Sequence, residues 1–505
     1  MTIEEVNILR NDMKEITKQI MELVNQRMEI AKKIGTIKTN LDIDIIDDKV
    51  ELGIKSYLFS NSKYMNLDPE FSGRIVNMLI NESIRIQNLE KNKLKGNQEA
   101  NRPRTVSSDQ SSWSMFIKQE VNSHHKFEIK SHLDVFNAAK NMELQGFKII
   151  HMEVGEPDFL PPNEVKKELT QIYDMHKFHY TQTAGIKELR IGLANHLSSF
   201  SLKNGFEIFE PISPDKIIVT PGGRFGIFCA FSALLKPGDE IITIEPAWPA
   251  CSDCANYLGV KNRIVKTNLE QNWEPEISEI ENQINLNTKI ICLNYPNNPT
   301  GKILKKKSYE QIMDLARKNG IYLLSDEVYS NYAYEPYRSI VNFDYDKSIL
   351  LGSFSKTFAM TGFRVGFVYS RESSLINRLI KIQALALTSV AEPMQFCALL
   401  ALNSDPEGNN KIMKKRLEIM CKYLKKLPFE YTYPEGAMYV FARINQDLNL
   451  TDLKLVELLL NHGVAVAPGS GFGSNYYDFI RLSTCLEEKK MMEGLEIISD
   501  LVDKL

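Results

Sequence analysis

The residues best suited to chemistry lie between Ser353 and Arg364. Lys356 follows an apolar run, residues 348–352, that predicts a short buried strand, so its amine lies where a strand ends. An amine can attack a carbonyl carbon, while the hydroxyl of Ser353 and the guanidinium of Arg364 can bind a phosphate. Together these groups suit a pyridoxal phosphate site, in which the lysine forms a Schiff base with the cofactor aldehyde. Taken alone, Lys356 fits a solvated polar loop better.

The pattern Ser353-x-x-Lys356 also fits the serine hydrolases of the penicillin-binding type. Their chemistry requires the tripeptides Ser-Asp-Asn and Lys-Thr-Gly elsewhere, and neither occurs in the sequence. The groups at the other predicted strand ends decide between the two interpretations.

Two predicted strands lead to groups that could hold the phosphate and the ring of such a cofactor. Residues 217–220 precede Gly222-Gly223-Arg224 and an apolar helix, residues 225–235. Glycines at such a junction let backbone N–H groups approach a phosphate at the helix N-terminus. Residues 241–244 lead to Trp248, whose ring could stack on a pyridine.

Two more predicted strands end in an amide and a carboxylate. Residues 290–293 lead to a turn-rich loop that contains Asn298, and residues 322–325 lead to Asp326. A carboxylate directly after a buried strand is costly unless a cation meets it, and a protonated pyridine nitrogen would do so. The alternation of helices and apolar strands predicts an α/β domain with a mainly parallel sheet, in which ligands bind at the carboxyl ends of the strands.

From residue 116 to residue 505 the sequence resembles the fold-type I, class I aminotransferases. The resemblance rests on an ordered series of motifs: Gly155-Glu156-Pro157-Asp158-Phe159, Tyr180, Gly222-Gly223, Trp248, Asn298-Pro299-Thr300-Gly301, Asp326-x-x-Tyr329, Ser353-x-x-Lys356, Arg364 and Arg481.

The resemblance implies pyridoxal 5'-phosphate as the cofactor and a role for each matched residue. Lys356 becomes the Schiff-base lysine and the proton carrier, Asp326 pairs with the pyridine nitrogen, and Arg481 binds the substrate α-carboxylate where Gly155 leaves room. The other implied cofactor contacts are Gly223, Arg224, Trp248, Asn298, Tyr329, Ser353, Arg364 and the partner subunit's Tyr180. Arg224 also suits a second substrate carboxylate, which favours aspartate, glutamate or prephenate; a surface arginine is the alternative.

The first forty residues carry an apolar stripe with helical spacing and predict one long helix of a helical bundle or coiled coil. Further helical patterns begin near Asp47 and Asp68. Arg27 lies on the stripe itself, and Arg10 and Lys38 lie one position off it. Cations and hydrogen-bonding side chains inside a helical bundle would bind a small dicarboxylate. The alternative is the charged rim of a coiled coil.

As a set, seven positions in residues 1–92 resemble the all-helical chorismate mutases: Arg10, Arg27, Lys38, Asp47, Glu51, Ser83 and Gln87. The resemblance implies a dimer with swapped helices, in which the cations bind the carboxylates and ether oxygen of chorismate and Arg10 reaches the partner's site. Glu51 and Gln87 would lie beside the reacting substrate. Val50 stands where that family usually has an arginine, which leaves open a non-catalytic dimerisation or effector-binding domain.

Length and composition set the frame for these sites. At 505 residues two or three domains are expected, and we place a helical domain at residues 1–92, a linker at 93–115 and the α/β domain at 116–505. A net charge of −3 gives no reason to expect nucleic acid or a membrane as a partner. No signal peptide is visible, and the seven cysteines are scattered, so we expect reduced thiols in a cytoplasmic protein. Cys251-x-x-Cys254 has no second pair or histidine cluster nearby, and we expect it to be structural, with no metal.

The two resemblances imply a bifunctional enzyme of aromatic amino-acid biosynthesis. It would convert chorismate to prephenate and act as an aminotransferase on prephenate or an aromatic 2-oxo acid, or on aspartate or glutamate. Its partners would be these small molecules and further copies of itself, as a homodimer or higher homo-oligomer. The alternatives are an aminotransferase with a non-catalytic helical domain, or a pyridoxal phosphate-dependent lyase on the same scaffold.

Overall fold

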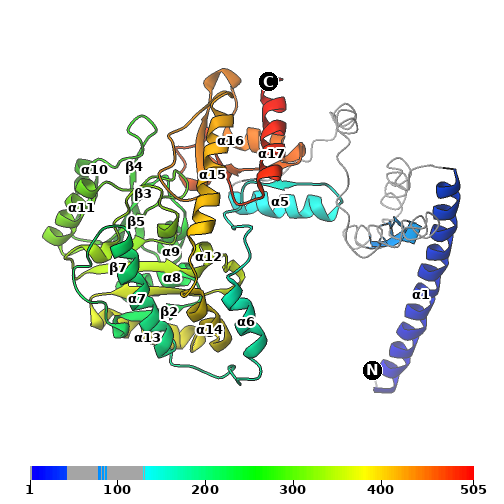
Figure 1. The fold of residues 1–505 in the computed structure, drawn as a ribbon, viewed down its shortest axis with the longest axis horizontal. Helices are drawn as coiled ribbons and strands as arrows, with labels where there is room; N and C mark the ends of the chain where they lie inside the picture. Colours follow the sequence, from blue (N-terminus) through cyan, green and yellow to red (C-terminus); the bar gives the residue numbers. More distant parts are fainter. Residues whose placement is uncertain are drawn as a thin grey trace. The chain divides into compact units, whose positions relative to one another are not determined.

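The computed structural model describes residues 3–41, 75, 78–80, 82–84, 86–87, 129 and 131–505 (Figure 1). The chain divides into two compact units, Met1–His124 with Lys140–Lys148, and His125–Ala139 with Ile149–Leu505. Among the described residues, no helix is long and apolar enough to cross a membrane. The linker predicted for residues 93–115 lies outside the described residues, so the domain boundaries stay a prediction.

The helical period predicted for the first forty residues is confirmed by α1 (Ile3–Asn40). Residues 75, 78–80, 82–84 and 86–87 are also helical, as predicted, and a cluster of their side chains is buried with side chains of α1. The closest approach lies at Gly35, where an added Cβ would come 2.8 Å from Gln87 Cα. Only a residue without a side chain lets the two helical segments come so near. The helix predicted from Asp47 lies outside the described residues.

Within residues 131–505 the main sheet has seven strands in the order β2-β8-β7-β6-β5-β3-β4. The strands are β2 (Ile217–Thr220), β3 (Glu240–Glu245), β4 (Lys261–Lys266), β5 (Thr288–Asn294), β6 (Tyr322–Asp326), β7 (Ser348–Ser353) and β8 (Gly366–Ser370). All are parallel except β8, which pairs antiparallel with both β2 and β7. The predicted mainly parallel α/β fold is therefore confirmed.

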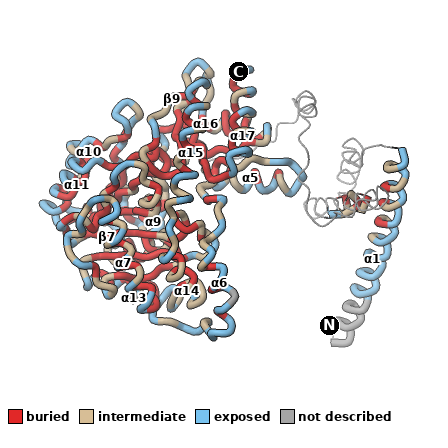
Figure 2. The backbone as a smooth tube through the Cα atoms, in the orientation of Figure 1, coloured by how far each residue is buried: buried red, intermediate tan, exposed pale blue. Residues whose placement is uncertain are grey.

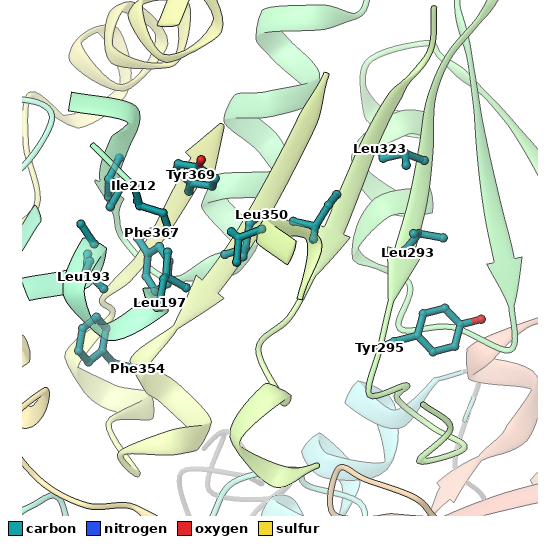
Figure 3. Packing of buried hydrophobic residues seen from close by; sticks show 14 of the residues in the cluster. Leu193, Leu197, Ile212, Leu293, Tyr295, Leu323, Leu350, Phe354, Phe367 and Tyr369 are labelled. Carbon is teal, nitrogen blue, oxygen red and sulfur yellow. The ribbon is translucent and has the colours of Figure 1, made fainter. Parts of the chain in front are cut away.

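Helices cover both faces of this sheet, so its central strands are buried on both sides (Figure 2). One face packs against α7 (Lys187–Lys203), α11 (Lys306–Asn319) and α14 (Glu392–Ala401), and the other against α8 (Gly223–Leu234), α9 (Ala250–Tyr257) and α13 (Ser373–Leu387). Figure 3 shows the first face, where Leu193 and Leu197 of α7 belong to the same buried cluster as Leu350 of β7. Burial on both faces explains why the strands read as continuous apolar runs.

A smaller α/β layer is built from segments before and after the large sheet in the sequence. Within the described residues it contains a four-stranded antiparallel sheet, β12-β13-β10-β9. Its strands are β9 (Phe429–Glu430), β10 (Tyr439–Ile444), β12 (Ala467–Pro468) and β13 (Phe479–Ser483). A parallel pair, β1 (Ile150–His151) and β11 (Val464–Ala465), lies apart from them. The helices of this region are α5 (His132–Leu144), α15 (Glu407–Leu424), α16 (Asp452–Asn461) and α17 (Glu488–Val502).

Candidate functional site

Lys356 lies in the short helix α12 (Phe354–Thr357), directly after β7 ends at Ser353. Its Nζ atom donates a hydrogen bond to the carbonyl oxygen of Gly155 at 2.7 Å. Burial lowers the pKa of the Lys356 amine. The charges of Cys485 and Glu156 oppose this effect, and the positive charges of Arg481 and Arg364 add to it by a smaller amount. A lowered pKa favours the neutral amine, which is the nucleophilic and proton-accepting form.

Asp326 is the last residue of β6 and its carboxylate is buried. Burial raises the pKa of Asp326 to about 6, although the Val328 backbone N–H donates to the carboxylate at 3.4 Å and the charge of Lys356 lowers the pKa. A buried carboxylate held in this way favours a cationic partner. A protonated ring nitrogen at this place would meet that requirement.

Arg481 of β13 is 1% exposed and faces the residues at the ends of the large sheet. Its Nη1 donates to Asn298 Oδ1 at 2.9 Å and its Nη2 donates to the Glu153 carbonyl, while its buried Nε has no hydrogen-bond partner among the described residues. The guanidinium also lies 4.3 Å from the ring centre of Tyr439. A buried cation that meets only neutral groups here is suited to binding an anion.

A chain of hydroxyl and amide groups joins this arginine to Tyr329. Asn298 donates from Nδ2 to the Tyr329 hydroxyl at 3.4 Å, and that hydroxyl lies 2.8 Å from the Tyr439 hydroxyl. Gly155 makes room for the pair, because a Cβ there would overlap the Tyr439 hydroxyl. Asn298, Tyr329, Gly155 and Arg481, which lie far apart in the sequence, thus form one connected site.

A phosphate-sized cradle is formed where β2 turns into α8. Gly222 has a φ of 82°, and a Cβ on it would lie 2.5 Å from Arg364 Nη2, so the guanidinium rests against the bare turn. Gly223 is the first residue of α8, whose N-terminal N–H groups point out of the helix. Ser353 caps α12, and its hydroxyl donates to Ser355 Oγ at 3.0 Å. Free N–H groups beside a cation and hydroxyls suit a phosphate.

The aromatic wall of the site is Trp248, which follows β3. The Arg224 guanidinium lies 5.3 Å and the His132 ring 4.6 Å from the Trp248 ring. A cavity of about 160 Å³ is lined by Trp248, Asn294, Asp326 and residues of the neighbouring strands. The carboxylate, the aromatic wall and this space lie together, as the predicted pyridine site requires.

The predicted serine-hydrolase alternative finds no support in the contacts of Ser353 and Lys356. The serine hydroxyl bonds within its own turn, and the lysine amine bonds to Gly155. Tyr180, predicted to act in the partner subunit's site, is 89% exposed, so this role stays a prediction.

Tyr439 and His132 were missed by the sequence analysis. Tyr439 begins an apolar run and reads as a core residue, and its bond to Tyr329 spans 110 residues of chain. His132 carries no motif at all. Their closeness to the site arises only when β10 and α5 fold against the end of the large sheet.

Four of the predicted residues can be placed in the helical unit. Ser83 and Gln87 are both buried, and Ser83 Oγ donates to the Leu79 carbonyl at 2.7 Å. Gln87 Oε1 and Arg27 Nε are buried without a hydrogen-bond partner among the described residues. Lys38 lies in α1 and is half-buried. Asp47, Glu51 and the side chain of Arg10 lie outside the described part of the chain.

Comparison with known families finds two matches. Residues 148–498 match the model for aminotransferase class I and II, and residues 9–88 match the model for chorismate mutase type II. The aspartate aminotransferase of Thermotoga maritima is 33% identical over 369 residues, which cover 72% of this chain and 94% of that protein. Its crystal structure superimposes with a TM-score of 0.69 at 32% identity, over 74% of this chain and 96% of that one. The aromatic aminotransferase of Pyrococcus horikoshii gives a TM-score of 0.66 at 32% identity, over 70% and 96% of the two chains.

Proposed function

The chain belongs to the class I and II aminotransferases and carries a chorismate mutase type II domain, and from this premise we propose that it converts chorismate to prephenate and aminates prephenate or an aromatic 2-oxo acid. One observation carries the transferase half: an amine with a lowered pKa, a carboxyl with a raised pKa and a buried guanidinium that meets neutral groups lie in one site. These three groups are what an amino-group transfer from an α-amino acid requires.

The cofactor we propose is pyridoxal 5'-phosphate, and the described residues fit it. The bare turn at Gly222 and Gly223 with Arg364 would hold the phosphate, and Ser353 would add a hydroxyl. Trp248 would cover the ring, Asp326 would meet its nitrogen, and Asn298 and Tyr329 would meet its phenolic oxygen. Bound there, the cofactor supplies the electron sink that allows a proton to leave the substrate Cα.

Arg481, Lys356 and Asp326 would each have a separate role in the transfer. Arg481 binds the α-carboxylate and so fixes the direction of the Cα–H bond. Lys356 Nζ would take the proton from Cα and later give it back, a role that burial favours because it lowers the pKa of the amine. Asp326 would keep the ring nitrogen protonated, and for this its carboxylate must be ionised. The positive charge of that nitrogen would lower the raised pKa of Asp326 and so favour the ionised carboxylate.

The fused domains suggest the substrate. Prephenate carries its ring on the carbon that corresponds to C4 of 2-oxoglutarate, so its two carboxylates have the spacing found in that acid. A site with Arg481 for one carboxylate and Arg224 for the other would therefore accept both. The Arg224 guanidinium lies 5.3 Å from the Trp248 ring, which supports this second role.

For the helical domain, we propose mutase chemistry in a pocket built from Arg10, Arg27, Lys38, Asp47, Glu51, Ser83 and Gln87. The unpartnered Arg27 Nε and Gln87 Oε1 are polar atoms that a bound substrate or its waters would satisfy. Donors aimed at the ether oxygen would stabilise the negative charge that develops there as the bond breaks. The alternative, a non-catalytic domain, rests on Val50.

We propose a homodimer or larger oligomer in the cytoplasm. The exposed Tyr180 supports the assembly, since its predicted role lies in the partner subunit's site. All seven cysteines are free thiols, as expected in a reducing compartment.

The experiment that tests the function follows chorismate and its products by mass spectrometry, with purified protein, pyridoxal phosphate and glutamate or aspartate. Arogenate or phenylalanine appearing from chorismate supports both activities. Prephenate accumulating alone refutes prephenate amination, and intact chorismate with transamination of added prephenate refutes the mutase. Pyruvate and ammonia formed from a cysteine conjugate without an acceptor would identify the lyase instead. Lys356→Ala is the matched control, since it should abolish amination and leave prephenate formation unchanged.

A further inference from the structure

His132 is the first residue of α5. Ser131 precedes it, accepts a hydrogen bond from the Asp134 backbone N–H at 3.3 Å and donates to Asp134 Oδ2 at 2.9 Å. On another side the backbone of Gly471 is in ordinary contact with this end of the helix, since a Cβ there would lie 3.6 Å from the His132 backbone nitrogen. These contacts define the position of the first turn of α5.

The imidazole packs on an aromatic wall that it shares with both arginines of the site. Its ring centre lies 4.6 Å from that of Trp248 and 6.3 Å from that of Phe472. The Arg224 guanidinium lies 5.3 Å from the same Trp248 ring, and the Arg481 guanidinium lies 4.9 Å from the same Phe472 ring. His132 is thus next to the group proposed for the first substrate carboxylate and next to the group proposed for the second.

One of its two ring nitrogens has no partner among the described residues. This atom, His132 Nδ1, is buried. Burial lowers the pKa of His132 to about 4, and the charges of Arg481 and Arg224 add to this effect, while Asp134 opposes it. At neutral pH the ring is therefore uncharged and can donate one hydrogen bond and accept another. A buried nitrogen of this kind costs stability unless a ligand or water meets it.

We propose that His132 is a specificity residue, which binds the second carboxylate of a dicarboxylic substrate together with Arg224 and packs its ring against a ring carried by that substrate. The proposal rests on the proposed function, because it takes Arg481 as the site of the first carboxylate. The substrate class is 2-oxo acids, and the matching amino acids, whose second carboxylate has the spacing of glutarate. Prephenate adds a flat ring at the carbon that would face the imidazole and Trp248.

Two substitutions separate the hydrogen bond from the ring. His132→Phe keeps a flat ring and removes both nitrogens, whereas His132→Asn keeps polar groups and removes the ring. The holoenzymes are compared on three acceptors: 2-oxoglutarate has the second carboxylate only, phenylpyruvate has the ring only, and prephenate has both.

For His132→Phe we expect KM to rise roughly tenfold or more for 2-oxoglutarate and prephenate, the cost of a hydrogen bond to a charged group, with KM for phenylpyruvate unchanged. For His132→Asn we expect KM for 2-oxoglutarate to stay within about threefold and KM for prephenate to rise. The value of kcat should change little, because the contact is made equally before and during reaction.

Calorimetric titration with glutarate, which cannot react, gives a second readout that does not depend on turnover. We expect the affinity for glutarate to fall in His132→Phe and to hold in His132→Asn. If KM changes equally for all three acceptors, or if glutarate binds His132→Phe as well as it binds the wild type, the proposal is overturned. Wild-type protein that transaminates none of the three acceptors would sink the proposed function instead, and the glutarate titration would still decide the role of His132.

Discussion

Asp326→Asn should affect the protein in opposite directions with and without the cofactor. The carboxyl pKa rises from an ordinary value near 3.8 to about 6 because the group is buried. A folded-state pKa above the unfolded value means that ionisation opposes folding: this cost is absent below pH 4 and complete above pH 6. A difference of about two pKa units corresponds to about 3 kcal/mol, and the amide of the variant, which does not titrate, avoids it.

We therefore expect the apoprotein of Asp326→Asn to be more stable than the wild-type apoprotein by up to about 3 kcal/mol at pH 7.5. The advantage should shrink as the pH falls through 6 and vanish near pH 4. The cofactor-loaded variant should show the reverse, with cofactor affinity and transamination reduced roughly 100-fold or more, because a buried charge loses its partner.

Urea unfolding of both apoproteins from pH 4 to 8, followed by tryptophan fluorescence, measures the first effect. Glu245 and Glu327 also have pKa values raised to about 7 by burial, but they are present in both proteins, so their contribution cancels in the difference. Spectral titration with pyridoxal phosphate measures the second effect. Equal stability of the two apoproteins at pH 7.5 would refute the reasoning that the ionised Asp326 carboxylate destabilises the apoprotein because it has no cationic partner.

Three further substitutions test other parts of the two sites. Arg481→Lys keeps the charge but loses the paired N–H groups, and kcat/KM for the amino donor should fall roughly 10- to 100-fold; an unchanged value would exclude Arg481 from carboxylate binding. Gly155→Ala places a Cβ on the Tyr439 hydroxyl, so the Tm should fall and transamination should be lost, whereas an alanine at the open Gly362 should do neither. Gln87→Ala should abolish the conversion of chorismate, as measured by its absorbance, and leave transamination of phenylpyruvate unchanged; persistent conversion would contradict the assigned pocket.

The parts of the site that the sequence predicted are those set by local structure. Lys356, Asp326, Asn298 and Trp248 each follow an apolar run, and the run itself shows that a strand ends there. The long helix of the N-terminal unit was predictable for the same reason, since its apolar residues repeat with the period of a helix.

Contacts between distant segments could not be predicted in this way. Arg481 reaches Asn298 across 183 residues of sequence, and Tyr439 lies in a run that is indistinguishable from core. His132 has its neighbours at positions 248 and 472, and no spacing rule connects these residues. Only the fold of the smaller sheet against the ends of the larger one brings them together.

The position of β8 sets the distance between two strand ends that border the proposed cofactor site. This strand lies between β2 and β7, and its residue Gly366 stands opposite both Thr220 and Ser353. The last residues of β2 and β7 are therefore two strand spacings apart, about 9.6 Å. The turn after β2 closes this distance, since a Cβ on Gly223 would lie 3.8 Å from the Cβ of Ser353. A one-residue insertion in β8 would shift the end of β2 relative to the end of β7. The site would then no longer match the length of its ligand, although every contacting side chain would still be present. Substitutions in evolution can change the side chains that line this site. The length of the ligand that it accepts is set by the hydrogen-bond register of the sheet.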